Sequence, residues 1–241
     1  MGDNRERPRP VPVSGQSAEV TAFLAKLDRL PVRPRPASAK GRLIFAMDAT
    51  ASREPTWDRA CRIQGEMFEA ASGLGGIDIQ LVYYRGFGEC KASRWLHAAA
   101  ELHDAMRAVS CVAGETQIER VLRHAIAQAD ADRLDALVFV GDAMEETSDT
   151  LVQLAGELAL LNVPVFVFHE GGEAVAARTF REIARLSRGA YCPFDSASAS
   201  ELKALLGAVA AYAAGGRQAL VDYSRKAGGG TLLLARQIGG P

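Results

Sequence analysis

The chain has 241 residues, of which 48% are hydrophobic and 24% charged, and its formal net charge is −1. This length and hydrophobic content suffice for one sizeable core with a tail at each end. The near-neutral charge leaves no basic surplus to neutralise phosphates, which argues against a nucleic-acid-binding protein. No run of 18 or more apolar residues predicts a membrane span.

The cysteines and the first residues bear on the compartment. Four cysteines are widely spaced and form no CxxC pair, a pattern typical of reduced thiols rather than of zinc ligands or a disulfide framework. They are Cys61, Cys90, Cys111 and Cys192. The N-terminal residues lack the apolar segment of a secretory signal. We therefore expect a cytoplasmic protein.

Composition divides the chain into three regions. Residues 1–39 are rich in proline and arginine and are expected to form a flexible arm, with a candidate short amphipathic helix at 18–30. A single folded domain is expected over residues 40–215. Residues 216–241 are a tail of unknown role that carries the apolar stretch Leu232–Leu234.

Within the domain, buried strands and amphipathic helices alternate. Apolar runs predict strands at 43–48, 77–84, 89–95, 136–142, 163–169 and 189–193, with a hairpin turn at 85–88. Helical periodicity and terminal signals predict helices near 57–71, 98–108, 117–130, 148–161, 174–187 and 198–213. This alternation predicts an α/β fold: a doubly wound, mainly parallel, Rossmann-like sheet with one antiparallel edge strand.

Oxygen-bearing side chains follow two of the buried strands. Asp48 ends the first strand, with Thr50 and Ser52 at alternate positions after it; Thr116 precedes a helix, and Asp142 ends a later strand. Because the carboxyl ends of neighbouring parallel strands border a ligand-binding crevice, we expect these side chains to lie together. Oxygen ligands of this kind suit Mg²⁺, Mn²⁺ or Ca²⁺ better than zinc. The sequence therefore predicts a divalent metal site.

The pattern Asp48-Ala49-Thr50-Ala51-Ser52, followed by Thr116 and then Asp142, resembles the metal-ion-dependent adhesion site (MIDAS) of von Willebrand factor type A (vWA) domains. The resemblance covers residues 40–215. It implies that Thr50, Ser52 and Thr116 bind the ion through side-chain oxygens, while Asp48 and Asp142 act directly or through water. It also implies a metal-dependent protein-binding adaptor, in which an acidic side chain of a partner protein completes the coordination of the ion.

Two positions depart from the family's pattern. Thr50 stands where Ser is commoner, which adds a methyl group to the site, and Ala143 stands where Gly often follows the Asp. Glu145 and Glu146 follow after one intervening residue. They either add charge to the site or form a solvated cluster at the start of the next helix.

Aromatic residues gather in the predicted hairpin, and two interpretations stay open. They are Tyr83, Tyr84, Phe87 and Trp95. Either they pack the hairpin against the sheet, or part of the group contacts a partner, since Tyr, Trp and Arg dominate interface hot spots. Under the second interpretation, the residues expected to contact the partner are Arg53, Arg85, Tyr84 and Trp95.

An enzymatic reading is the alternative. Asp48 with Thr50 is also similar to the start of haloacid-dehalogenase phosphatases, but these usually have a second Asp, the general acid, where Thr50 stands. His169 ends a predicted strand and could serve a metal-dependent hydrolase, although a histidine that faces solvent or a backbone carbonyl is the better explanation of its position. We find no convincing catalytic constellation and expect a binding module. A third hypothesis is an interaction scaffold that binds no metal.

Overall fold

The computed structural model describes residues 40–72, 74–194 and 199–226. The predicted arm and the stretch Leu232–Leu234 lie outside these ranges. The strands are β1 (Gly41–Asp48), β2 (Ile77–Arg85), β3 (Glu89–Leu96), β4 (Ala136–Gly141), β5 (Val165–Glu170) and β6 (Ala190–Phe194). The helices are the 3-10 turn η1 (Ala51–Arg53), α2 (Glu54–Ile63), α3 (Gly65–Ser72), α4 (Ala99–Arg107), α5 (Ile118–Ala131), α6 (Ser148–Leu160), α7 (Ala174–Leu186) and α8 (Ala199–Lys226).

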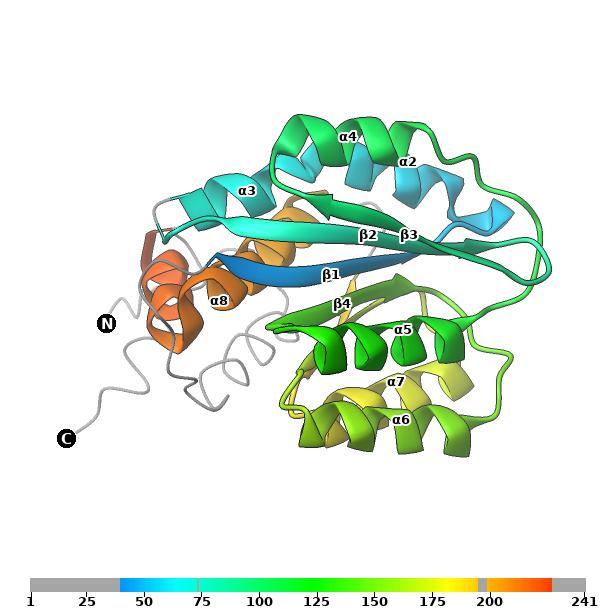
Figure 1. Ribbon diagram of the computed structural model, residues 1–241. Coiled ribbons are helices and arrows are strands. Elements are labelled where there is room, and N and C mark those ends of the chain that lie inside the picture. Colours follow the sequence, from blue (N-terminus) through cyan, green and yellow to red (C-terminus); the bar gives the residue numbers. More distant parts are fainter. Residues whose placement is uncertain (1–39, 73, 195–198, 227–241) are drawn as a thin grey trace, which may run out of the picture.

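The strands form one sheet in the order β3-β2-β1-β4-β5-β6. All neighbouring pairs are parallel except β2 and β3, which form the antiparallel hairpin at the edge. Helices α2, α3, α4 and α8 lie on one side of the sheet, and α5, α6 and α7 lie on the other (Figure 1). The predicted fold class is therefore confirmed.

Strand β1 lies at the centre and is buried on both faces. Leu43, Phe45 and Met47 belong to the core under α2, α3, α4 and α8. Ile44 and Ala46 belong to the core under α5, α6 and α7. Each large side chain removed from water contributes about 1.5–3 kcal/mol. Because both faces are covered, the strand is continuously hydrophobic rather than alternating.

The predicted helix 57–71 is two helices in the structure. Helix α2 begins at Glu54, with Pro55 in its first turn, where a missing N–H costs nothing. It ends at Ile63, and α3 begins at Gly65. Glycine is a poor helix former, which accounts for a break at this point.

The last helix continues beyond the predicted end of the domain. Helix α8 extends to Lys226 and is interrupted at Gly216, whose positive φ of 70° breaks the helical geometry. Leu220 is buried in the core, and the Tyr223 hydroxyl donates to Glu66 Oε1 at 3.3 Å. Residues 217–226, which the sequence reading assigned to the tail, are thus helical and extend the packed structure.

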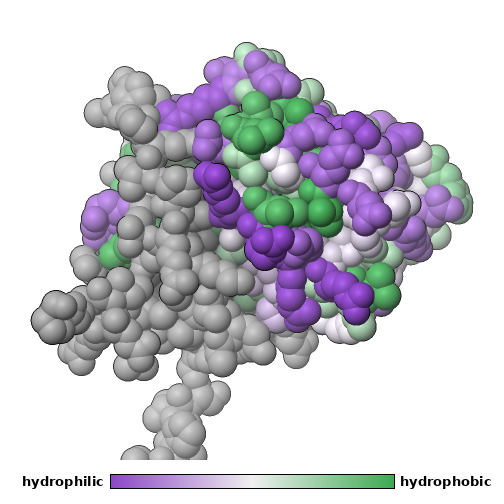
Figure 2. All heavy atoms as spheres, turned by 90° about the horizontal axis from the view of Figure 1, so that it is seen from below, coloured by the Kyte–Doolittle hydropathy of each residue, from purple (hydrophilic) through white to green (hydrophobic). Residues whose placement is uncertain are grey.

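The surface on the side of α6 is mixed in character. On the side of α6, hydrophilic side chains surround separate hydrophobic patches (Figure 2). Among the helices of the described ranges, none is long and apolar enough to cross a membrane.

Candidate metal centre

The candidate site lies where the strand order reverses. Strand β1 has β2 on one side and β4 on the other, and Met47 pairs with Val140. This register brings the carboxyl ends of β1 and β4 to the same edge of the sheet, the usual position of a ligand crevice in α/β folds. A pocket of about 220 Å³ opens there. It is lined by Asp48, Thr50, Ala51, Ser52, Ala113, Gly114, Thr116, Asp142, Ala143 and Glu145.

Asp48 supplies a buried carboxylate at the pocket wall. Its side chain is 1% exposed, and its Oδ1 atom accepts a hydrogen bond from the Thr50 backbone N–H at 2.7 Å. Its Oδ2 atom is buried and, like the nearby Tyr84 hydroxyl, makes no well-formed hydrogen bond in the described structure. Burial raises the pKa of this carboxyl, and the interactions with Thr50 and with the Tyr84 hydroxyl oppose the rise only in part. An unpaired buried oxygen is unfavourable unless another group satisfies it.

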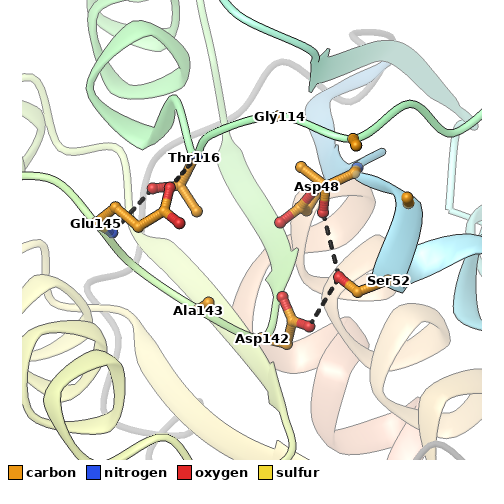
Figure 3. A pocket seen from close by; sticks show the side chains of 10 residues that line it. Asp48, Ser52, Gly114, Thr116, Asp142, Ala143 and Glu145 are labelled. Carbon is orange, nitrogen blue, oxygen red and sulfur yellow. Dashed lines mark hydrogen bonds between the residues drawn. The ribbon is translucent and has the colours of Figure 1, made fainter.

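Three further side chains of the predicted site join Asp48. The hydroxyl oxygens of Thr50 and Ser52 lie 3.4 Å apart, and the Ser52 hydroxyl donates to Asp142 Oδ2 at 3.4 Å. Ser52 and Asp142 point toward one another in the pocket, with Asp48 nearby (Figure 3). Asp142 is partly open to solvent, with 28% of its side chain exposed.

The structure places Thr116 differently. It lines the same pocket, but its side chain lies beside Glu145, apart from Ser52 and Asp142 (Figure 3). Its hydroxyl accepts from the Glu145 N–H at 3.0 Å and donates to Glu146 Oε2 at 2.8 Å. That hydroxyl would have to leave Glu146 to serve an ion, so its role as a ligand stays a prediction.

Glu145 and Glu146 hold the start of helix α5. Glu145 Oε2 accepts from the Thr116 N–H at 2.9 Å, and Glu146 Oε1 accepts from the Glu119 N–H at 2.7 Å. The helix has no side-chain cap of its own at Gln117, so Glu146 satisfies a free N–H group of its first turn, and Glu145 binds the backbone just before the helix. Burial raises the pKa of Glu146. Neither interpretation from the sequence included this capping role.

Arg53 is a buried cation beside the site. It is 2% exposed, one guanidinium nitrogen lies 3.6 Å from Asp142 Oδ2, and another pairs with Glu170 Oε2. Glu170 also accepts a hydrogen bond from the Thr56 hydroxyl. The prediction that Arg53 contacts a partner is wrong in this structure, because the turn η1 directs its side chain inward to these carboxylates.

His169 supports the backbone that carries Asp142. Its Nε2 atom lies 3.1 Å from the Asp142 carbonyl oxygen, and its Nδ1 atom lies 2.8 Å from the Tyr191 hydroxyl. The side chain is fully buried, and burial lowers its pKa. Of the two plain explanations, the backbone carbonyl is correct and the solvent-facing position is not.

The other predicted partner contacts are mostly engaged within the protein. Tyr84 is completely buried and stacks on Phe139, so it cannot contact a partner. Tyr83, the preceding residue of β2, faces the opposite side of the sheet. Burial, followed by nearby Asp48, raises the pKa of Tyr84 well above its ordinary value. Trp95 is half-buried under the Arg42 guanidinium, 4.4 Å away.

Arg85 is also partly buried. Its guanidinium donates to the Ser110 carbonyl at 2.7 Å and pairs with Glu89 at 3.0 Å. The contact with Ser110 joins the hairpin to the loop before α5. For most of the aromatic group, the packing interpretation is therefore correct, and Phe87 is the exception.

The donor set fits a divalent cation. Asp48 and Asp142 supply two negative charges, and Thr50 and Ser52 supply neutral hydroxyl oxygens at the same pocket. The unpaired Asp48 Oδ2 atom is the kind of group that a bound cation would satisfy. Within the described ranges, no group of three or more His, Cys, Asp or Glu side chains forms a metal cluster.

Comparison with solved structures gives fold-level similarities. The VWA domain of SpRpn10 is 13% identical, with a TM-score of 0.54, over 70% of this chain and 94% of that domain. The pilus adhesin SpaC from Lactobacillus rhamnosus GG is 11% identical, with a TM-score of 0.57, over 78% of this chain and 31% of the adhesin. The chain thus spans about a third of that protein.

Proximal thread matrix protein 1 from the mussel byssus, in a structure described with a zinc-occupied MIDAS motif, is 12% identical with a TM-score of 0.58. The match covers 72% of this chain and 46% of the mussel protein. No family model matches the sequence, and no curated protein matches it. At such low identities the comparisons establish architecture alone: the chain has a vWA-like α/β fold.

Proposed function

We propose that this chain is a metal-dependent protein-interaction module. It binds Mg²⁺, Mn²⁺ or Ca²⁺ in the pocket between β1 and β4 and grips a partner protein through an acidic side chain. The observation that carries this proposal is the buried Asp48 Oδ2 atom, which has no hydrogen-bond partner in the described structure. It lies at a pocket that also holds two hydroxyls and a solvent-accessible carboxylate.

Each residue of the site has a distinct task. Asp48 and Asp142 balance the charge of a divalent ion, while the hydroxyls of Thr50 and Ser52 donate lone pairs without adding charge. The Ser52 hydroxyl already bridges toward Asp142 at 3.4 Å, so little movement separates these oxygens from a shared ligand. A bound cation would supply an electrophilic position for a carboxylate of the partner.

The fold-level similarities support the proposal. One structural neighbour is described with zinc in a MIDAS motif and another as a pilus adhesin. Both descriptions are consistent with a vWA-like fold used for metal binding and adhesion.

The arrangement favours binding over turnover. Asp48 is held by the Thr50 backbone N–H, and both ring nitrogens of His169 have partners within the protein. The four cysteines, all within the described ranges, form no disulfide with one another, which is consistent with the cytoplasmic location that we also propose.

Calorimetric titration with Mg²⁺ and with Mn²⁺ tests the proposal. We expect saturable binding to the full chain, abolished in the double variant Asp48→Ala, Asp142→Ala and weakened in Ser52→Ala. Ser72→Ala is the matched control, because the exposed Ser72 hydroxyl donates to the Glu69 carbonyl at the end of α3 and does not line the pocket. Wild-type protein that binds neither ion, and does not bind Ca²⁺ in a parallel titration, would contradict the metal-dependent function.

A further inference from the structure

An exposed aromatic side chain lies at the tip of the hairpin between β2 and β3. The exposed large hydrophobic residues of the described ranges are Phe87, Val112, Leu160 and Val175. Phe87 is 82% exposed, and Val112 is 44% exposed. Single exposed hydrophobic residues are ordinary on protein surfaces. The support beneath Phe87 is not ordinary, as its backbone contacts show.

The hairpin tip is tied down on several sides. Gly86 and Gly88, with φ of 56° and 90°, flank Phe87 in conformations that favour glycine. The Gln117 side-chain amide donates to the carbonyls of Arg85 and Gly86 at 3.3 and 3.2 Å. The Arg120 guanidinium donates to the Gly88 carbonyl at 2.6 Å. Phe87 is therefore exposed on a tip that helix α5 holds in place.

The same tip adjoins the wall of the metal pocket. The Gly86 N–H donates to the Val112 carbonyl at 3.5 Å, and the Val112 N–H donates to the carbonyl of Ala49, the residue after Asp48. Gly114, which lines the pocket, packs so closely on the hairpin that a Cβ atom there would lie 2.2 Å from the Gly86 carbonyl oxygen. Backbone contacts thus connect Val112 to the residue that follows Asp48, and connect Gly86, the residue before Phe87, to Val112 and to the pocket residue Gly114.

We propose that Phe87 and Val112 form an apolar rim of the metal pocket, and that the rim determines which partner the site accepts. The partner is a protein segment in which one carboxylate has a large apolar side chain close by in sequence. The carboxylate enters the pocket, and the apolar side chain packs on the rim. This inference rests on the proposed function and specifies its partner.

The charges around the pocket favour a single carboxylate over an acidic run. Glu115 and Glu145 are both exposed on loops that line the pocket. Additional acidic residues of a partner would meet these side chains with like charge, which is unfavourable across an interface. Apolar neighbours avoid this repulsion. An aromatic side chain on a pre-organised tip also loses little conformational freedom on binding.

The test begins with a phage-displayed library of short random peptides that carry one fixed central Glu. The library is selected on the full-length protein in Mg²⁺, and the most enriched peptide is then synthesised. Its affinity is measured by fluorescence anisotropy for the wild type, for Phe87→Ser and for Leu160→Ser, with and without chelator. Leu160 is the matched control, because it is as exposed as Phe87. It lies at the C-terminal end of α6, whereas the loop that carries Asp142 leads into the N-terminal end of that helix.

We expect selected peptides to carry a large apolar residue near the Glu. We also expect Phe87→Ser to weaken binding about tenfold or more, Leu160→Ser to leave it unchanged, and chelator to abolish it. Chelator-sensitive binding that Phe87→Ser leaves intact would overturn the apolar rim while the proposed function stands. Binding that chelator leaves intact, or no selected peptide at all, would overturn both.

Discussion

Asp48→Asn should stabilise the ion-free protein and at the same time remove its response to metal. In the wild type, Asp48 is buried and has one unpaired carboxylate oxygen. Burial raises its pKa, which means that the fold disfavours the charged form. Asparagine has the same shape and no charge, and its side-chain oxygen can still accept from the Thr50 N–H.

The magnitudes follow from general energetics. An unpaired buried polar group costs about 1–3 kcal/mol, and the asparagine amide leaves part of that penalty in place, so we expect a gain of about 1 kcal/mol. In the wild type, Mg²⁺ at about a hundredfold excess over its Kd should add about 2.7 kcal/mol. For a chain of this size, that corresponds to a rise in Tm of roughly 5–10 °C.

Thermal unfolding followed by circular dichroism, in chelator and in Mg²⁺, measures both effects. Asp104→Asn is the matched control, since that aspartate is largely exposed on α4 and should change neither value. A variant that is less stable than the wild type in chelator would refute the reasoning, because Asp48 would then be needed for the fold itself. A variant that keeps the full Mg²⁺ shift would refute the assignment of Asp48 to the ion.

Three further changes test the surroundings of the site. Gly114→Ala should lower the free energy of unfolding, measured by urea titration, by about 1–3 kcal/mol, because the added Cβ would overlap the Gly86 carbonyl. Gly156→Ala is the control: there is open space around Gly156, so this change should be neutral or stabilising. Glu146→Ala should lower the free energy of unfolding by about 1–2 kcal/mol, because the hydrogen bonds to the Thr116 hydroxyl and the Glu119 N–H are lost. Glu115→Ala, at an exposed neighbour, is the control, and an equal loss there would contradict the capping role. Burial lowers the pKa of His124 from the ordinary 6.5, so the unfolded chain binds more protons than the folded chain just below that pH. The free energy of unfolding should therefore fall on acidification below pH 6.5, and it should fall less in His124→Gln. Urea midpoints at successive pH values measure both.

The fold could be predicted from the sequence because its signals are local. The unbroken apolar run of β1 indicates a strand covered on both faces, and the hairpin turn at 85–88 separates two strands by the expected length. The end of the last helix could not be predicted in the same way. Its final turns are fixed by contacts such as Tyr223 with Glu66, which lie 157 residues apart in the sequence.

The site was predictable only as far as its motif extends. Asp48, Thr50, Ser52 and Asp142 meet at one pocket because strand ends impose their positions. The orientation of Thr116 depends on Glu145 and Glu146, which lie 29 and 30 residues further along the chain. No periodicity in the sequence predicts that contact. The prediction that Tyr84 contacts a partner is wrong because the sequence does not show that helices cover the face of the sheet on which this side chain lies.

Glu170 shows how a residue outside the pocket can set its affinity for cations. Arg53 and Glu170 form a buried ion pair, so their charges cancel and Asp48 with Asp142 leave two negative charges for a divalent ion. Glu170→Gln would remove that balance and leave the Arg53 guanidinium, 3.6 Å from Asp142, as a competing cation. We therefore expect the variant to bind Mg²⁺ about tenfold more weakly in calorimetry.

The double variant Arg53→Met, Glu170→Gln removes both charges and should recover most of that affinity. Glu182→Gln breaks only an exposed ion pair with Arg185 on α7 and should change nothing. If Glu170→Gln folds normally and binds Mg²⁺ as tightly as the wild type, Arg53 does not compete for Asp142. If the double variant stays as weak as the single one, the loss comes from displaced backbone at the end of β5 and not from charge.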